Sequence, residues 1–279
     1  MAEKQRAQKV LVKRHSGVTR ITHWTNVLAL TLLLMSGLQI FNAHPALYWG
    51  MKSAFAHPWL SMRMVEVGGA PHGQTTVGGL HFDTTGLFGW SGAEGMRQQR
   101  GFPSWATIPS YRSLTDGRRW HFFFAWLFVI NGLIYLAVGF IGGHIRKDLW
   151  PNRAQLKLSH VLHEISTHAR FRFPKGEEAR HYNVLQKGAY LAVVLVLLPL
   201  MLLTGLSMSP GFNAAVPHLI DVFGGRQGAR SVHFISAGLI VLFIVVHLVM
   251  VVASGTWNNI RSMITGKYAI EVEPKGDAA

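Results

Sequence analysis

The sequence contains no cysteine and few acidic residues. The absence of cysteine among 279 residues excludes disulfide bonds, thiolate-bound iron–sulfur clusters and covalently attached c-type haem. Any cofactor must therefore be held by histidine, methionine or oxygen ligands. Charged residues make up only 14% of the chain, and 49% of the residues are apolar. This balance is typical of a membrane protein rather than of a soluble domain.

Four apolar windows are long enough to cross a bilayer as helices, because about 20 residues span roughly 30 Å of hydrocarbon. They cover residues 21–41, 121–143, 187–208 and 232–254. We therefore predict an all-α integral membrane protein, a four-transmembrane-helix bundle that forms a single domain over residues 1–279. A long outer loop at 43–118 joins the first two helices, and a linker at 144–182 joins the second to the third.

The basic residues lie mainly beside these windows. The formal net charge is +14, and eight of the lysines and arginines fall within the linker at 144–182. Six more precede the first window. By the positive-inside rule, the linker and both termini are expected in the cytoplasm, which predicts a multi-pass membrane protein with both ends on the inner side. The basic residues do not form the aromatic-interleaved face that would suggest nucleic acid as a partner.

The outer loop is rich in glycine, tryptophan, histidine and proline, and it is too long for a simple connector. We expect it to fold over the outer ends of the helices or against a partner. Within it, residues 47–64 are a candidate for a short interfacial helix, since tryptophan and tyrosine favour the headgroup region. The N-terminal tail is expected to be mobile, and 254–279 to be a polar tail. The first apolar window lacks a small-residue cleavage signature, so the first helix is expected to be retained.

Histidines occur at matched depths of the predicted helices. His233 and His247 bound the apolar stretch HFISAGLIVLFIVVH, where a helix would separate them by about 21 Å and turn them only about 40° apart. His23 begins the first window and His121 begins the second. Depth therefore predicts that His23 pairs with His247 near the cytoplasmic surface, and that His121 pairs with His233 near the outer surface.

Paired imidazoles from different helices are the axial ligands of b-type haem, and a four-helix bundle supplies two such positions. The pattern predicts two haems b, with His23, His121, His233 and His247 as ligands of the haem irons. Histidines that merely lie in the interfacial region are the alternative, but ionisable residues within membrane spans are rare and usually functional.

Arginines and glycines accompany these histidines. Arg20, Arg118 and Arg230 each precede one of them by three residues, so we expect them beside haem propionates. Small residues that would let a flat ring approach a helix are Gly37, Gly132, Gly139, Gly205 and Gly238. The arginine and the outer histidine recur in a weak internal repeat between RRWHFFFAWLFVINGLIY in the second window and ARSVHFISAGLIVLFIVVH in the fourth.

Other histidines remain without an assigned role. His160 and His163 have a helical spacing that suits a metal, but no further ligand supports a metal site, and a solvated amphipathic face is the favoured interpretation. His144 is expected at the interface, with a propionate or quinone contact as the alternative. Nothing in the sequence determines the geometry of the outer-loop histidines, which are His44, His57, His72 and His81.

The motifs RITHW at 20–24, RRWHF at 118–122, HYNVLQKGAY at 181–190 and LLTGLSMSP at 202–210 carry a family resemblance. The chain resembles the membrane di-haem cytochrome b family, which includes the cytochrome b subunits of nickel–iron hydrogenase, thiosulfate reductase and formate dehydrogenase (gamma type) and is b561-like. The resemblance implies that the four histidines bind two haems b. It also implies that Asn183, Gln186 and Lys187 contact a quinone headgroup, for which a polar helix cap is the alternative.

Together these features favour a membrane-anchoring electron-transfer subunit rather than a catalyst that acts alone. It would move electrons between a partner redox subunit at the outer face and the quinone pool. The partner suggested by family analogy is a molybdenum enzyme or a hydrogenase-like dehydrogenase. Two alternatives remain open. One is a stand-alone b561-type oxidase that passes electrons from a small donor to quinone, and the other is a histidine-lined transporter.

Overall fold

The computed structural model describes residues 8–143, 150–152, 155–170 and 183–272. The chain divides into two compact units. Unit 1 consists of Met1–Trp24, Gly132–Leu197 and Ile240–Ala279, and unit 2 consists of Thr25–Asn131 and Leu198–Leu239. Each of the long helices contributes residues to both units.

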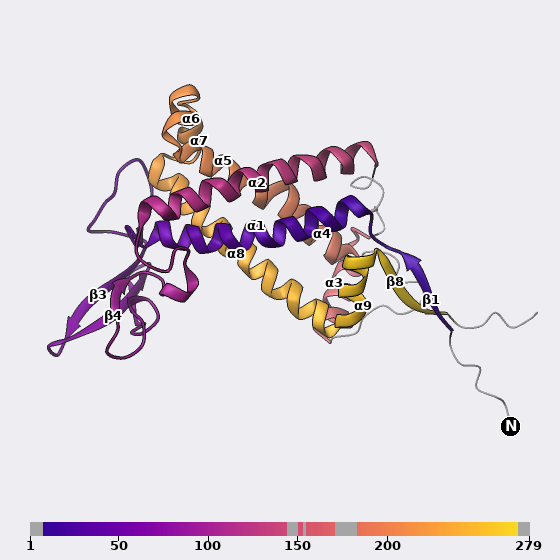
Figure 1. Cartoon of the computed structure of the whole chain (residues 1–279), viewed down its shortest axis with the longest axis horizontal. Helices are drawn as coiled ribbons and strands as arrows, with labels where there is room; N and C mark the ends of the chain where they lie inside the picture. The colour runs from indigo at the N-terminus through magenta and orange to yellow at the C-terminus, as the bar shows by residue number, and fades with distance from the viewer. Residues whose placement is uncertain (1–7, 144–149, 153–154, 171–182, 273–279) are drawn as a thin grey trace, which may run out of the picture. The chain divides into compact units, whose positions relative to one another are not determined.

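Four long helices dominate the structure (Figure 1). They are α1 (Gly17–Phe41), α2 (Leu114–Ile141), the third span formed by α4 (Val184–Ala192), a π-helical turn (Val193–Leu197) and α5 (Leu198–Met208), and α8 (Arg226–Ala253). Within the described residues, these are the four helices long and apolar enough to cross a membrane. The prediction of four membrane-spanning helices is therefore confirmed, although all four begin before the predicted residues 21, 121, 187 and 232.

Polar caps explain why two of the helices begin before their apolar windows. The Thr19 backbone N–H donates to Ser16 Oγ over 3.1 Å at the start of α1. At the start of α2, the Asp116 backbone N–H donates to Ser113 Oγ over 3.2 Å, and this hydroxyl donates to the Asp116 carboxylate over 2.9 Å. Such contacts satisfy backbone donors that the first turn of a helix leaves unpaired, so the helix extends into polar sequence.

Unit 2 brings α1, α2, α5 and α8 together. Asn131 on α2 donates to the side-chain oxygen of Asn26 on α1 over 2.8 Å. The ring of Phe41 on α1 lies 4.9 Å from that of Phe234 on α8. The short helices α6 (Pro210–Ala215) and α7 (Leu219–Val222) connect α5 to α8.

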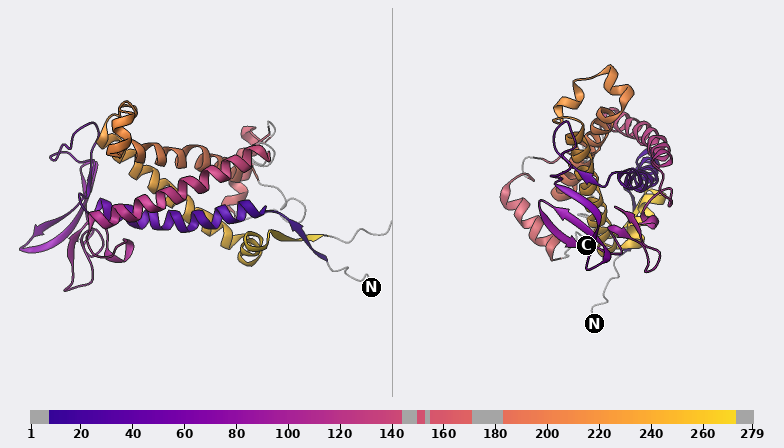
Figure 2. Two further views of the ribbon diagram at one scale, coloured as in Figure 1. Left: turned by 45° about the horizontal axis from the view of Figure 1, so that its top comes forward. Right: turned by 90° about the vertical axis from the view of Figure 1, so that its left-hand side faces the viewer.

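The outer loop contains β-sheet, which corrects the all-α prediction for this segment. An antiparallel sheet has the strand order β2 (Ala46–Leu47), β3 (Leu60–Val67), β4 (Ala70–Val77) and β5 (Leu80–Asp83). A second pair is formed by β6 (Gly89–Ser91) and β7 (Gln98–Arg100), and a 3₁₀ turn covers Ser104–Ala106. Figures 1 and 2 show the β3–β4 hairpin projecting where α1 ends and α2 begins.

The interfacial helix predicted within 47–64 is wrong, because β3 occupies part of this range. Two glycine pairs, Gly68–Gly69 and Gly78–Gly79, provide the reason. All four glycines have positive φ, between 55° and 88°, and each pair forms the two-residue connection between adjacent strands. Such turns match the twist of antiparallel strands, so they favour hairpins over a helix.

An apolar core fixes the sheet to the helices of unit 2. Its buried members are Phe41, Leu47, Leu60 and Met62, and Trp59, Phe88, Phe102 and Phe234 pack against them. The Trp59 indole donates to Ser231 Oγ over 2.9 Å, and Ser231 Oγ donates to the Tyr48 carbonyl over 2.6 Å. The loop is therefore anchored to α8 two residues before His233.

In unit 1 the two ends of the described chain pair with each other. β1 (Gln8–Lys13) is antiparallel to β8 (Lys267–Val272), which follows α9 (Thr256–Thr265) (Figure 2). The predicted mobile N-terminal tail is thus an ordered strand from Gln8. The linker contains α3 (Leu158–Ala169), while its residues 144–149, 153–154 and 171–182 lie outside the described residues.

Candidate functional site

Two pairs of histidines face each other, one pair in each unit. In unit 2, the ring centroids of His121 on α2 and His233 on α8 are 6.3 Å apart, with ring planes inclined by 60°. In unit 1, the centroids of His23 on α1 and His247 on α8 are 6.4 Å apart, with an inclination of 58°. The structure thus brings together the same partners that depth along the helices predicted.

Each histidine of the unit 2 pair has a hydroxyl group at its Nδ1 atom. Ser36 Oγ on α1 lies 3.0 Å from Nδ1 of His121. Thr204 Oγ1 on α5 lies 2.9 Å from Nδ1 of His233. Neighbouring helices therefore orient both imidazoles.

A glycine follows each of these hydroxyl residues and allows the imidazole to approach the helix. A Cβ atom on Gly37 would lie 3.4 Å from Cε1 of His121, and one on Gly205 would lie 3.6 Å from Cε1 of His233. Larger side chains at either position would push into the ring. Gly132 and Gly238, by contrast, have no atom within 4 Å of an added Cβ, so they border open space.

The unit 1 pair has mainly aromatic neighbours. The His247 ring stacks on Phe243, with centroids 5.8 Å apart and planes 16° apart, and Phe243 in turn meets Tyr190 edge-on. The ring of Trp24 lies 5.2 Å from that of His23. Among the described residues, Nδ1 of His23 is buried and has no hydrogen-bond partner.

The three arginines predicted at propionates make different contacts. Arg20 donates through Nη1 to the carbonyl of Ile264 in unit 1. Arg230 donates through Nη2 to the carbonyl of His44 in unit 2. Arg118 is exposed. A guanidinium carries five N–H donors, so the observed bonds leave Arg20 and Arg230 with capacity to bind an anion.

The residues predicted to contact quinone form a helix cap. Asn183 Oδ1 accepts from the Gln186 backbone N–H over 2.9 Å, and Gln186 Oε1 accepts from the Asn183 backbone N–H over 3.4 Å. This reciprocal capping box begins α4. Lys187 donates to Gln155 Oε1 over 3.3 Å. The cap considered as the alternative is therefore present, and a quinone contact stays a prediction.

Among the described residues, the remaining histidines form no metal site. On α3, His160 lies 4.0 Å from Glu164, and within the described part of the chain no group of three His, Asp or Glu side chains could hold a metal ion. His144 lies outside the described residues. On the sheet, Asp83 accepts from the hydroxyl and backbone of Thr85 and from His72, and these bonds lower the pKa of Asp83 to about 2.

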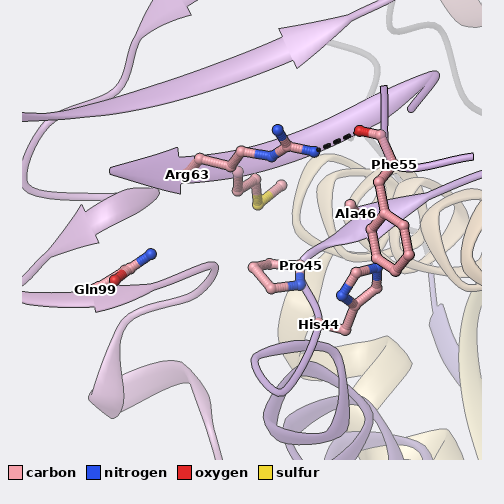
Figure 3. Close-up of a pocket in the computed structure, with 7 residues that line it drawn as sticks. His44, Pro45, Ala46, Phe55, Arg63 and Gln99 are labelled. Carbon is pink, nitrogen blue, oxygen red and sulfur yellow. Dashed lines mark hydrogen bonds between the residues drawn. The ribbon is translucent and has the colours of Figure 1, made fainter. Parts of the chain in front are cut away.

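A cavity of about 310 Å³ opens in the loop region of unit 2 (Figure 3). It is lined by His44, Pro45, Ala46, Phe55, Met62, Arg63 and Gln99. Figure 3 shows the Arg63 guanidinium directed at the Phe55 carbonyl, 3.5 Å away, and the His44 ring beside the Phe55 ring. Burial, followed by the charges of Arg230 and Arg63, lowers the pKa of His44. The cavity thus combines one permanent cation with a largely neutral imidazole.

Ser36 and Thr204 are residues of the site that were not predicted from the sequence. Their signal is a short repeat, MSGLQ at 35–39 and LTGLS at 203–207, in which a hydroxyl residue, a glycine and a leucine follow one another. The repeat recognised between α2 and α8 therefore extends to the neighbouring helices α1 and α5. In the sequence these two hydroxyl residues look like ordinary helix residues. Their role becomes visible only in the structure, where each lies beside a histidine ring.

Comparison with known proteins identifies relatives of the whole helical region. A family model described as prokaryotic cytochrome b561 matches residues 14–266, a range that includes all four long helices and both histidine pairs. A putative protein-methionine-sulfoxide reductase subunit, YedZ1 of Azospira oryzae, is 26% identical over 240 residues, which are 85% of this chain and 89% of that relative. The putative cytochrome YdhU of Escherichia coli is 34% identical over 137 residues, which are 47% of this chain and 50% of YdhU. No solved structure matches the chain significantly.

Proposed function

The chain belongs to the prokaryotic cytochrome b561 family, and from this membership we propose that it is a membrane-anchoring subunit with two haems b. In this role it moves electrons between a partner redox subunit at the outer face and the quinone pool. Membership itself identifies a membrane electron-transfer protein that binds haem b. The number of haems, the partner and the quinone are the proposal.

The spacing of the histidine rings is the observation that supports two haems. A metal–imidazole nitrogen bond is about 2 Å long, and the nitrogen lies roughly 1.1 Å from the ring centre, so two imidazoles on one iron have centroids about 6.2 Å apart. The two observed separations are 6.3 Å and 6.4 Å. Each pair therefore has the separation that a single six-coordinate iron requires, and haem b would supply a one-electron carrier there.

The side chains around each pair can bind the rest of a haem. Arg230 and Arg118 in unit 2, and Arg20 in unit 1, each lie three residues before a histidine of a pair, and they suit propionate carboxylates. The glycines that border open space, Gly132 and Gly238, leave room for a flat ring against a helix. Apolar helix surfaces exclude water from the remaining faces and lower the local dielectric.

The paired chain ends support the proposed membrane orientation. Because β1 and β8 are hydrogen-bonded neighbours, both ends of the described chain lie on the same side of any membrane that the helices cross. That side carries Lys9, Lys13, Arg14 and Lys267, which favours the cytoplasm under the positive-inside rule. We therefore propose a protein of the bacterial inner membrane with both termini in the cytoplasm.

The quinone is proposed to bind at the start of α4. Asn183 and Gln186 use their side-chain oxygens to cap the helix, so contacts with quinone oxygens would come from their NH₂ groups and from the ammonium group of Lys187. All of these groups donate hydrogen bonds, and the two carbonyl oxygens of a quinone accept them.

A protein partner is proposed for two reasons. The relative from Azospira oryzae is named a reductase subunit, and the outer loop is an ordered sheet anchored to the helix that carries His233. A molybdenum enzyme or a hydrogenase-like dehydrogenase fits the role by family analogy.

Haem content per chain tests this function. We expect the purified full-length protein to contain two haems, with sharp alpha and Soret bands after reduction by dithionite. His233→Ala and His247→Ala should each retain one haem, and the retained spectra should differ because different pairs remain. A parent protein with one haem, or variants that lose the same haem, would contradict the two-haem proposal.

The loop cavity favours a second candidate, a stand-alone oxidase that accepts electrons from a small donor. Arg63 and the apolar wall formed by Phe55 and Met62 suit a small reductant that carries a negative charge and a ring. If this candidate is correct, the protein should purify without a second subunit, and Arg63→Ala should raise the KM for a small anionic reductant without changing haem content. Co-purification with a stoichiometric redox subunit supports the first candidate.

Family membership sets aside the third interpretation from the sequence, a histidine-lined transporter. The prokaryotic cytochrome b561 family consists of electron-transfer proteins, and both histidine pairs lie within the matched range.

A further inference from the structure

Two buried hydroxyl groups set the unit 2 histidines apart from ordinary helix histidines. Ser36 and Thr204 are both 0% exposed, so each hydroxyl must find its hydrogen-bond partners within the protein. For each hydroxyl, one partner is Nδ1 of a histidine on another helix.

The direction of the Ser36 bond follows from its second partner. Ser36 Oγ lies 2.6 Å from the carbonyl of Leu32 and 3.1 Å from that of Leu33. A carbonyl can only accept, and a serine hydroxyl has a single hydrogen, so this hydrogen points along the helix. The contact with His121 can then form only if Nδ1 carries the hydrogen and donates it to Ser36.

The same reasoning applies to Thr204. Its Oγ1 lies 2.6 Å from the carbonyl of Leu200 and 3.2 Å from that of Met201. The threonine hydrogen is therefore directed to its own helix, and Nδ1–H of His233 is the donor over 2.9 Å. In both rings Nε2 is left with the lone pair, which is the form that binds a metal.

We propose that Ser36 and Thr204 are positioning residues that hold His121 and His233 in the tautomer with a hydrogen on Nδ1 and lower the reduction potential of the iron that these histidines bind. The proposal rests on the proposed function, since it presumes haem at the unit 2 pair. An acceptor at Nδ1–H makes the imidazole a stronger electron donor. A stronger donor stabilises ferric over ferrous iron, so the potential falls.

The arrangement occurs twice, which argues against a chance contact. In each copy the hydroxyl residue precedes a glycine, Gly37 or Gly205, over which the same imidazole lies. The hydroxyl thus fixes the rotation of the ring while the glycine admits its edge. Bonding of a hydroxyl to its own helix is not sufficient for this role, because Ser207 makes such a bond to the carbonyl of Thr204 and has no contact with a histidine that the structure describes.

Thr204→Val is the first test, because valine keeps the volume of threonine and removes only the hydroxyl. Potentiometric titration of the purified, haem-loaded protein should show two midpoints. In Thr204→Val we expect one midpoint to shift upward and the other to stay at its parent value, with two haems retained. The ferric electron paramagnetic resonance signal of the shifted haem should change as well. Ser36→Ala should shift the same midpoint in the same direction.

Ser207→Ala is the matched control, since Ser207 is equally buried on the same helix. It should leave both midpoints unchanged. The proposal is overturned if Thr204→Val retains both haems with unaltered midpoints, or if Ser207→Ala produces the same shift.

Thr204→Ser decides the case in which Thr204→Val loses haem. Serine restores the hydroxyl without the methyl group, so the variant should recover two haems and the parent midpoints; a midpoint shift in Thr204→Ser would overturn the proposal. Failure of the proposed function looks different, because the parent protein itself would then contain fewer than two haems.

Discussion

The two histidine pairs have nearly the same ring separation but different supports. The unit 2 pair is held by hydroxyl groups from neighbouring helices, with a glycine beside each ring. In unit 1, His23 has an Nδ1 without a described partner, and His247 is held by stacking on Phe243. Helix packing alone can therefore place two imidazole rings 6.3–6.4 Å apart. The tautomer and the electron-donor strength of each imidazole depend on its local hydrogen bonds.

Alanine substitution of each ligand gives the largest expected effect and tests the pairing itself. His121→Ala and His233→Ala should lose the same haem, because the proposed function assigns both ligands of one iron to the unit 2 pair. His23→Ala and His247→Ala should lose the other haem. Reduced-minus-oxidised spectra and haem content per chain should therefore sort the four variants into two groups. If His121→Ala grouped with His247→Ala, the pairing would be wrong.

Enlarging a glycine beside the unit 2 pair should damage that pair alone. An added Cβ on Gly205 already meets His233 at 3.6 Å, so the branched side chain of Gly205→Val would displace the ring at a cost of about 1–3 kcal/mol. We expect more than half of the unit 2 haem to be lost and the unit 1 haem to be retained. Gly211→Val is the control, since nothing lies within 4 Å of an added Cβ there. Equal losses in both variants would show general misfolding instead.

The two proposed haems should differ in reduction potential, in the direction set by the hydrogen bonds at their ligands. The unit 2 site, with an acceptor at both Nδ1 atoms, is expected to have the lower midpoint. His247→Ala, which removes the unit 1 haem, should therefore leave the lower midpoint in a potentiometric titration, and His233→Ala should leave the higher one. The reverse assignment would mean that burial or propionate charge outweighs the hydrogen bonds.

A smaller effect of pH is expected in the loop of unit 2. Burial, and then the charges of Arg230 and Arg63, lower the pKa of His44 from its ordinary value of 6.5. The folded loop thus prefers neutral His44, so its contribution to stability is fully present above about pH 6.5 and is lost as the pH falls below that value. Limited proteolysis of the loop should accelerate from pH 7 to pH 5. The change should be weaker in His44→Gln, which cannot be protonated, and an equal acceleration in both proteins would exclude His44 as the cause.

The hairpins of the outer loop were predictable in principle. The two Gly-Gly pairs occur in the stretches EVGGAP and TVGGLH. Two adjacent glycines are a strong local signal for a two-residue hairpin turn. The interfacial helix was predicted instead because tryptophan and tyrosine are abundant around residues 47–64. Composition described the segment as a whole, whereas the turn signal depended on two adjacent residues.

The role of Asn183, by contrast, could not be predicted from the sequence. The sequence was compatible with both a helix cap and a quinone contact, because one amide side chain suits either role. The structure shows the side-chain oxygens in the cap, and the family resemblance is what supports a quinone nearby. Local pattern could not separate these roles, since a cap and a ligand contact can use different atoms of the same group.

The sequence by itself determined the four membrane-spanning helices, the four histidines and their pairing, because apolar length and depth along a helix are properties of the local chain. Only the tertiary structure decided what supports those histidines. Ser36 and Thr204 act across helix interfaces, and β1 meets β8 from the opposite end of the chain. Such contacts join residues that are far apart in sequence, and helical periodicity carries no information about which side chain a neighbouring helix presents.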